Sequence, residues 1–381
     1  MDKTKMDMKS LLKKLVETES PSHDREAVNH VGALVAAEAN RLGAQTEIIS
    51  NQQTGNHVLA RFPSNHPSTF NLQLATFQPS NPILLLCHMD TVFPLGALAK
   101  MPFHEADGKI FGPGTLDMKS GIVICLAAIE ELQNTDGLKQ PVTLLCTSDE
   151  EIGSHTSHEL IEKLGKESAA VFVFEPALVD GSLKTWRKGG GGYKVTVKGR
   201  AAHAGGDHEK GRNAIEEMAH QIIAIQKLTD YTKQTTLNVG VIHGGTVSNV
   251  VPDEAIIEVD VRIMQPGEWE RIEVEMNKLK PVLNGTSLHI SGQLNRPPMP
   301  FDETMSATFA KAQSIAAGIG MDLKAGGTGG ASDGNFIAPL GIPLLDGMGA
   351  IGEGYHSERE FIFADSLEQK KNLLVALLKN W

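Results

Sequence analysis

Three short and almost wholly apolar runs constrain the fold of this chain more than any other feature of its sequence. They cover residues 83–87, 142–146 and 171–174. Apolar strands of this length are typical of a sheet that is covered on both faces. Residues 118–132, between the first two runs, have the apolar spacing of a helix. Alternating strands and helices favour a mostly parallel sheet, so we predict an α/β domain.

The ends of the chain and its middle predict different kinds of structure. Residues 9–42 have helical periodicity with a turn at Ser20-Pro21-Ser22, and α/β character returns from about residue 296. Between them, a glycine run at 189–192, which we expect to be flexible, opens a stretch with the order β-α-β-β-α-β. That order is the ferredoxin-like α+β arrangement. We therefore predict a discontinuous α/β domain (1–187 and 296–381) with an inserted ferredoxin-like domain (188–295).

Composition excludes several classes of function. The formal net charge of −11 argues against a nucleic-acid partner, which would require a basic face. No apolar run approaches the ~20 residues of a membrane-spanning helix. Three cysteines, each inside an apolar run, suit small core residues in a reducing compartment. The N-terminal residues lack the apolar stretch of a secretory signal, so we expect a cytoplasmic protein. A periplasmic protein with its leader removed would have the same pattern.

Each of the three apolar runs ends in side chains that can bind a metal. The first is followed by His88 and Asp90, the second by Glu150 and Glu151, and the third by Glu175. Ligands of open α/β sheets bind at the carboxyl ends of the strands. If the strands are parallel, these side chains meet at one edge of the sheet. Three such ends together predict a site there.

Two further candidates lie outside the strands. Asp117 opens a predicted helix after a glycine-rich turn, where it could equally be a helix cap. His356 lies in a polar loop, where a histidine is commonly just solvated. As a set, the imidazoles and carboxylates suit zinc. Two dications and a bridging hydroxide would neutralise Asp117, Glu151 and Glu175, whereas one dication would leave a costly buried negative charge.

The adjacent acids suggest a division of labour. Glu150 and Glu151 point to opposite faces of an extended segment, so one can bind metal while the other moves a proton. Asp90, two residues beyond His88, can accept a hydrogen bond from the other imidazole nitrogen and fix the tautomer. The alternatives are a solvated pair of glutamates and a simple turn aspartate.

Five motifs resemble the signatures of a two-zinc metallopeptidase family and occur in the family's order over nearly the whole chain. The family includes glutamate carboxypeptidases of the carboxypeptidase G type, acetylornithine and succinyl-diaminopimelate deacylases, aminoacylases and dipeptidases. The motifs are HMDTVFP (88–94), GPGTLDMKSG (112–121), TSDEEIGS (147–154), FEP (174–176) and GYHSERE (354–360).

The resemblance implies a role for each residue of the predicted metal site. Asp117 would bridge two Zn²⁺, which Co²⁺ or Mn²⁺ can replace. His88 and Glu175 would complete one zinc site, and Glu151 and His356 the other. Glu150 would be the general acid/base and Asp90 the orienting partner of His88. The resemblance also implies a cis peptide after Asp117, although many members have a second aspartate where this chain has Met118.

The resemblance also implies roles for residues outside the metal site. His203, in KGRAAHAGGD, would support the oxyanion, and Asn249 would be a neutral donor. Arg262 has the planar fork that suits a carboxylate, although strand arginines commonly serve surface ion pairs. Asp333, in a glycine-rich run without a P-loop ending, would line the substrate pocket. The inserted domain would form a homodimer and a lid over the site.

We therefore expect a glutamate carboxypeptidase-like enzyme that cleaves an amide bond next to a free carboxylate. The substrate would be a small peptide or an N-acyl amino acid. The nearest alternative is an N-acyl-amino-acid deacylase or dipeptidase that uses the same two-zinc site. A binding protein that has lost catalysis would be expected to lack at least one of the metal ligands or Glu150, and all are present. A one-metal carbamoylase-like enzyme is a third possibility.

Overall fold

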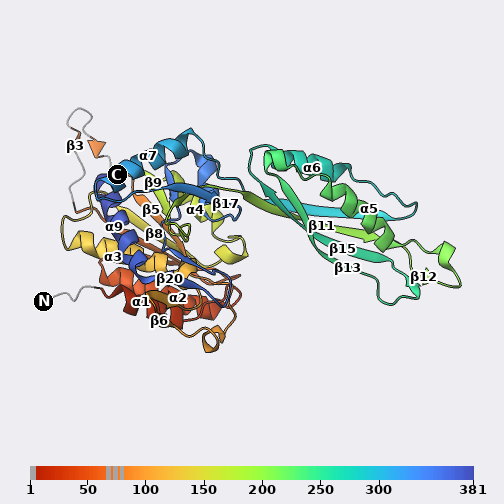
Figure 1. Ribbon diagram of the computed structural model, residues 1–381, viewed down its shortest axis with the longest axis horizontal. Coiled ribbons are helices and arrows are strands. Elements are labelled where there is room, and N and C mark those ends of the chain that lie inside the picture. Colours follow the sequence, from red (N-terminus) through yellow and green to blue (C-terminus); the bar gives the residue numbers. More distant parts are fainter. Residues whose placement is uncertain (1–5, 66–69, 72–75, 78–80) are drawn as a thin grey trace. The chain divides into compact units, whose positions relative to one another are not determined.

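The computed structural model describes residues 6–65, 70–71, 76–77 and 81–381. They form two compact units (Figure 1). Unit 1 comprises Met1–Trp186, Phe301–Thr328 and Ser332–Trp381, and unit 2 comprises Arg187–Pro300 and Gly329–Ala331. The expected boundaries were 187/188 and 295/296. Within the described ranges, no helix has both the length and the apolar composition needed to cross a membrane.

An eight-stranded sheet is the centre of unit 1, and its middle strands are parallel. In spatial order the strands are β1 (Gln45–Ile49), β2 (His57–Phe62), β8 (Val142–Thr147), β5 (Ile83–His88), β9 (Ala170–Val173), β18 (Leu344–Asp346), β10 (Leu183–Arg187) and β17 (Ala325–Thr328). The pairs β8–β5, β5–β9 and β9–β18 are parallel, whereas β1–β2, β2–β8 and β10–β18 are antiparallel. The three apolar runs are therefore neighbours, and the α/β prediction is confirmed.

Both faces of this sheet are buried, as uninterrupted apolar strands require. On one face, Leu85 and Phe172 join a core with residues of the helices, while Leu84 and Val171 are fully buried on the other face. Both ends of the chain contribute to the first face (Figure 1). Its helices are α1 (Met8–Glu17), α2 (Arg25–Arg41), α3 (Ser120–Gln133), α7 (Glu303–Ala317) and α9 (Ala364–Asn380).

Shorter elements complete unit 1. Two more helices are α4 (His158–Lys166) and α8 (Gly334–Ile337), and the pair β3 (Phe70–Asn71) and β4 (Thr76–Phe77) is antiparallel. A small antiparallel sheet has the order β19 (Gly352–Glu353), β20 (Phe361–Phe363), β7 (Lys109–Phe111) and β6 (His104–Ala106). It joins the loop after β7 to the loop before β20, and both loops carry candidate site residues.

Unit 2 has the predicted β-α-β-β-α-β order. Its elements are β11 (Gly189–Lys198), α5 (Ala214–Gln226), β13 (Thr236–Gly244), β15 (Glu254–Ile263), α6 (Glu268–Lys278) and β16 (Ser287–Arg296), with a short ladder of β12 (Ala202–His203) and β14 (Val250–Val251). The sheet order is β13-β15-β11-β16, and every pair is antiparallel. Residues of α5 and α6 share one apolar core with β11 and β15.

The expectation of a flexible glycine run at 189–192 was wrong, because all four residues lie in β11. The glycines are needed for close packing. A Cβ at Gly191 would lie 2.6 Å from the backbone oxygen of Gln293 and 2.6 Å from the ring of Trp269. A Cβ at Gly189 would meet the backbone of Arg296 and Pro298 equally closely. A run of glycines required for close packing cannot be told from a flexible linker by its sequence alone.

Gly191→Ala should destabilise unit 2, whereas Gly192→Ala should be tolerated better. The methyl group at position 191 must displace backbone or the Trp269 ring, and overpacking of this kind costs about 1–3 kcal/mol. At Gly192 the nearest contact is 3.1 Å, to one backbone oxygen of Val259. Hydrogen–deuterium exchange of β11 peptides in the full chain measures the difference. Equal protection of β11 in both variants would contradict this account of the glycines.

Candidate metal centre and active site

The carboxyl ends of three adjacent parallel strands bring the first candidate residues together. His88 is the last residue of β5 and pairs in register with Thr147 of β8. Glu150 and Glu151 follow β8 in a short 3₁₀ turn, and Glu175 follows β9 by two residues. Parallel strands end at the same edge of the sheet, so these side chains share that edge, where α/β proteins commonly bind ligands.

Asp117 is held beside these strand ends by the loop between β7 and α3. This loop requires glycine, because Gly112 and Gly114 have φ angles of 148° and 72°. A Cβ at Gly114 would also lie 2.6 Å from Thr91. The peptide bond between Asp117 and Met118 is cis, as the resemblance implies. Asp117 is buried, with a relative exposure of 9%.

The two oxygens of Asp117 face two different groups of side chains. Oδ1 is 3.1 Å from Nε2 of His88, which is 3.5 Å from Oε1 of Glu175. Oδ2 is 3.4 Å from Nε2 of His356, which is 3.1 Å from Oε2 of Glu151. Each group therefore has one imidazole, one separate carboxylate and one oxygen of Asp117.

Glu150 lies with the first of these groups. Potential ligand atoms of His88, Glu150 and Glu175 lie within 4.8 Å of one another, and so do those of His88, Asp117 and Glu151. The structure thus brings together all six side chains that the sequence predicted for metal binding and proton transfer.

Asp90 connects the strand ends behind the cluster. It is fully buried, and its carboxylate accepts the backbone N–H groups of Glu150 and Glu151, both at 3.2 Å. Ser22 also donates to it, at 2.7 Å. Nδ1 of His88 is 3.1 Å from the Asp90 carbonyl oxygen and 3.5 Å from its Oδ1. A carbonyl only accepts, so Nδ1 carries the proton and Nε2 is left to face Asp117 and Glu175.

The charges of the cluster favour a bound cation. Side-chain bonds to Asp117 and Glu151 raise the pKa of His356 to about 11. Burial alone would lower the pKa of His88, but bonds to Asp117, Asp90 and Glu175 outweigh it and raise that pKa well above its ordinary value. Burial raises the pKa of Glu151 to about 7. These directions mark a buried concentration of negative charge.

The donor set fits divalent metal ions. Imidazole nitrogen with carboxylate oxygen is the ligand chemistry of zinc, and zinc imidazoles are commonly oriented by a further hydrogen bond of the kind His88 makes. Asp117, with one oxygen toward each group, is placed where a shared ligand of two ions would lie. The residues therefore fit two ions rather than one.

Three of the other predicted site residues belong to unit 2. His203 and Asn249 are neighbours in unit 2, because the N–H of Ala204 donates to the carbonyl of Asn249 at 2.9 Å. Gly205 and Gly206 donate backbone N–H groups to Nδ1 of His203, which leaves Nε2–H as its donor. Arg262 is partly exposed on β15, and its Nε donates to Asp260 at 2.9 Å.

Asp333 lies in the interior of unit 1, with an exposure of 2%. Its carboxylate accepts from Ser154 at 2.5 Å and from Thr147 at 3.4 Å. Both partners belong to the segment that carries Glu150 and Glu151. This position supports a role in holding that segment, while direct contact with substrate stays a prediction.

Two residues near the cluster were missed by sequence reasoning. Glu360 accepts three backbone N–H groups of the loop that carries Asp117. Ser22 contacts Asp90 from the turn between α1 and α2. An acid four residues after His356 was a usable signal for Glu360. For Ser22 only a turn could be predicted, because its partner is 68 residues away.

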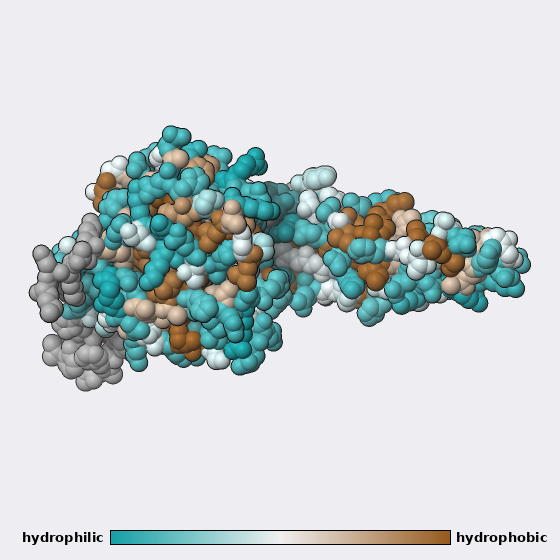
Figure 2. All heavy atoms as spheres, turned by 90° about the horizontal axis from the view of Figure 1, so that it is seen from below, coloured by the Kyte–Doolittle hydropathy of each residue, from teal (hydrophilic) through white to brown (hydrophobic). Residues whose placement is uncertain are grey.

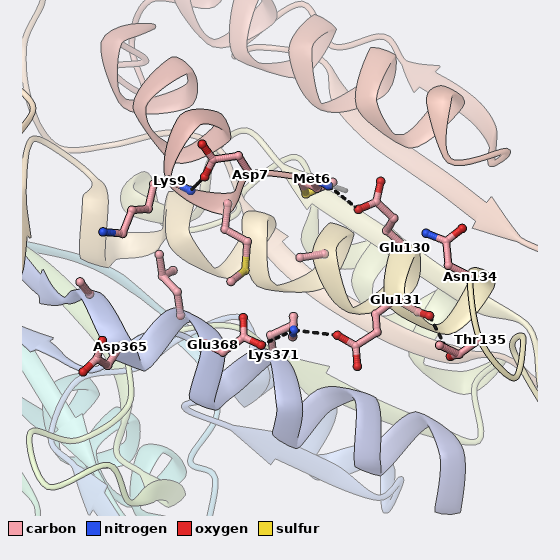
Figure 3. A pocket seen from close by; sticks show the side chains of 14 residues that line it. Met6, Asp7, Lys9, Glu130, Glu131, Asn134, Thr135, Asp365, Glu368 and Lys371 are labelled. Carbon is pink, nitrogen blue, oxygen red and sulfur yellow. Dashed lines mark hydrogen bonds and ion pairs between the residues drawn. The ribbon is translucent and has the colours of Figure 1, made fainter. Parts of the chain in front are cut away.

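A separate cavity of about 620 Å³ in unit 1 includes none of the predicted site residues in its lining (Figure 3). It is lined by residues of α1, α3 and α9 together with Met6 and Asp7. Figure 3 shows Lys371 between Glu131 and Glu368, at 2.7 and 2.5 Å. Glu130 likewise contacts Arg41 at 2.8 Å. Each of these three carboxylates therefore has a lysine or arginine within 2.8 Å.

Comparisons with known proteins place the chain in a family. The family model for "Peptidase family M20/M25/M40" matches residues 84–380. Carboxypeptidase G2 of Pseudomonas sp. (strain RS-16) is 27% identical over 379 residues, covering 96% of this chain and 87% of that protein. Succinyl-diaminopimelate desuccinylase of Bordetella avium is 28% identical over 319 residues, covering 78% and 83%.

A solved structure has the same fold. Aminopeptidase PepT from Bacillus cereus superposes with a TM-score of 0.79 at 22% identity, covering 98% of this chain and 97% of that one. The family match extends over more than half of the chain and includes the cluster at the sheet edge. The chain therefore belongs to peptidase family M20/M25/M40, and it is a metallohydrolase that acts on amide bonds.

Proposed function

We propose that this protein is a two-zinc carboxypeptidase that cleaves an amide bond next to a free carboxylate and releases a C-terminal glutamate or a similar amino acid. The observation that carries the metal stoichiometry is the division of the two Asp117 oxygens between two ligand groups. The match to carboxypeptidase G2, over 96% of this chain, supports the reaction class.

The geometry of the cluster indicates which residues would hold the metals. His88 and Glu175 would complete one site with Asp117, and His356 and Glu151 the other. Zinc would supply a water of lowered pKa and polarisation of the amide carbonyl, and Co²⁺ or Mn²⁺ can replace it.

Glu150 is the proposed proton carrier. It lies within reach of the first ligand group without being one of the five proposed ligands. Asp90 holds the backbone of Glu150 and orients His88 at the same time. Glu150 would therefore take a proton from the attacking water and deliver it to the leaving nitrogen.

Residues of unit 2 are proposed to bind the substrate. Nε2–H of His203, fixed as a donor by Gly205 and Gly206, suits an oxyanion, and Asn249 beside it is a second donor. Arg262 would bind the free carboxylate, in exchange for its bond to Asp260. In unit 1, Asp333 would line the pocket or hold its wall.

The positions of Arg262 and His203 within unit 2 support a homodimer. Arg262 pairs with Gly190 at the start of β11, whereas His203 lies beyond Lys198 at its other end. β11 covers about 27 Å between Gly190 and Lys198, at ~3.4 Å per residue. That is far longer than the few bonds between a scissile carbonyl and a neighbouring carboxylate. If both residues contact one substrate, a second chain supplies one of them.

The surface of unit 2 supports the same assembly. β13 is an edge strand of its sheet, and Val241 and Ile242 on it are exposed, as are Ile215 and Ile223 on α5. Figure 2 shows hydrophobic side chains gathered on one face of this unit. Exposed apolar groups beside an unpaired strand edge are typical of an interface.

Two further points concern context. The match to succinyl-diaminopimelate desuccinylases favours, as the alternative, an N-acyl-amino-acid deacylase with the same cluster. All three cysteines are buried free thiols, which supports the expected cytoplasmic location.

A hydrolysis panel tests the proposed substrate class. The zinc-loaded and cobalt-loaded enzyme should hydrolyse folyl- or peptidyl-glutamates with a higher kcat/KM than N-acetyl or N-succinyl amino acids and dipeptides. Arg262→Lys should raise KM for the preferred substrate, because an ammonium cannot bind a carboxylate bidentately. Preference for N-acyl amino acids would overturn the carboxypeptidase assignment and support the deacylase.

Glu150→Gln should lower kcat by at least about a hundredfold, because the amide cannot accept a proton. Metal content, measured by elemental analysis of the purified chain, should stay at two ions. Glu353→Gln, an exposed glutamate outside the cluster, is the matched control and should keep normal turnover. Substantial activity in Glu150→Gln would show that another group is the base.

Mixing two inactive variants tests the homodimer. Glu150→Gln and His203→Ala should each be nearly inactive alone. After dissociation and reassembly together, about a quarter of the wild-type activity should return, because half of the dimers are mixed and each has one intact site. No recovery, with mixed dimers demonstrated by mass spectrometry, would place His203 in the site of its own chain or outside any site.

A further inference from the structure

Glu360 is a buried residue that connects two parts of the metal-binding cluster. It is 1% exposed. Its Oε1 accepts the N–H groups of Leu116 and Asp117 at 2.7 and 3.0 Å, and its Oε2 accepts the N–H of Gly114 at 3.0 Å. Both oxygens of one side chain thus accept from one short loop, and one of the two bonds to Oε1 comes from the backbone N–H of Asp117 itself.

That loop also has backbone bonds of its own, from Thr115 to Gly112 and from Lys119 to Gly114, and Glu360 adds three bonds from outside the loop. The loop leaves the small sheet at Phe111, which pairs with Phe361 of β20. Glu360 directly precedes Phe361, so it lies where the β7 and β20 segments separate. The side chain of Glu360 then enters the turn that the loop makes before α3. The left-handed backbone at Gly114 directs its N–H into this turn, and the N–H groups of Leu116 and Asp117 point the same way.

The segment that carries Glu360 also carries His356. The N–H of Glu360 donates to Ser357 at 3.2 Å, and that of Ser357 donates to Gly354 at 3.0 Å, so residues 354–360 form one bonded turn. His356, at a φ of 59°, faces Asp117 Oδ2 from this turn. One short stretch of chain therefore supplies a candidate ligand and also fixes the loop of the shared aspartate.

We propose that Glu360 is a positioning residue for the metal centre, which sets Asp117 so that each of its oxygens faces a different group. The proposal rests on the proposed function, because it assigns Asp117 to two ions. Glu360 holds the Asp117 backbone through hydrogen bonds and does not itself bind metal. The residues that hold metal ligands in place typically change metal affinity about 10–100-fold when they are replaced.

The nature of the side chain follows from the bonds it makes. Three N–H donors converge on two oxygens, so both oxygens must accept. Glutamine has the same shape but offers one oxygen and one NH₂ group. In Glu360→Gln, the NH₂ group must face N–H donors on one side of the turn. The loop would have to shift, and Asp117 would shift with it.

Unit 2 contains a matched control for a purely structural role. Glu217 is also fully buried, and its carboxylate accepts backbone N–H groups of Val282 and Leu283. Thr286 also donates to it, at 3.0 Å. It therefore organises a loop as Glu360 does, without contacting any candidate ligand. Glu217→Gln should weaken folding in the same way and leave metal binding unchanged.

The test is metal affinity of the full chain, measured by competition with a chromophoric zinc chelator and by zinc stoichiometry. Wild type should bind two Zn²⁺. Glu360→Gln should bind at least one of them tenfold or more weakly, whereas Glu217→Gln should match wild type. Urea unfolding of both zinc-free variants shows whether their losses of stability are comparable. Equal zinc affinity in Glu360→Gln and wild type would overturn the proposal.

A second variant keeps the test decisive if Glu360→Gln does not fold. Glu360→Asp keeps two acceptor oxygens on a shorter side chain, which cannot reach all three N–H groups. Weakened zinc binding in this variant supports the proposal, and wild-type affinity contradicts it. If wild type itself binds one zinc, the two-zinc function fails, and the effect of Glu360 variants on that one zinc then decides the positioning role.

Discussion

The burial of several carboxylates at one sheet edge is the constraint on which the rest of this structure depends. Asp117, Glu151 and Glu175 approach one another with little exposure to water, and two histidines face them. Like charges in such a position are costly unless they are paired or bind a cation. The directions of the pKa shifts at His88 and His356 express the same negative field. Bound divalent metal ions would offset this cost and supply the chemistry of a metallohydrolase.

Around the cluster, hydrogen bonds from uncharged N–H and O–H groups to buried carboxylates position the candidate ligands. The parallel strands β8, β5 and β9 deliver one ligand segment each, and Asp90 ties two of these segments together through the backbone of Glu150 and Glu151. Asp333 holds the same segment from the other side through Ser154. These acids accept hydrogen bonds from N–H and O–H groups and are buried behind the candidate ligands. Geometry is therefore specified by residues that need not touch either metal or substrate.

The sequence predicted the parts of this arrangement that follow from local pattern. Apolar runs and the polar residues that end them identified three strand ends, and parallel pairing was enough to place His88, Glu151 and Glu175 together. Contacts between distant segments could not be predicted in this way. Ser22 and Glu360 lie far along the chain from their partners. Nothing local distinguishes Ser22 from an ordinary turn residue, and the spacing of Glu360 from His356 does not identify the loop that it contacts. The prediction of flexibility at 189–192 was wrong for a different reason: glycine is favoured both in flexible segments and where the backbone is closely packed.

Most of the candidate metal ligands are more buried than the unit 2 residues proposed to bind substrate. All candidate ligands lie in unit 1, where each faces at least one other within 3.5 Å, so a change at one disturbs its neighbours. His203, Asn249 and Arg262 lie in unit 2 with exposed or partly exposed side chains and few bonds. Substitutions there disturb little packing, so specificity can change while the metal centre stays intact. Relatives of this chain named as a carboxypeptidase and as desuccinylases are consistent with such a division. Under the proposed function, substrate choice depends on the few polar contacts of unit 2, and the sheet edge of unit 1 determines the reaction.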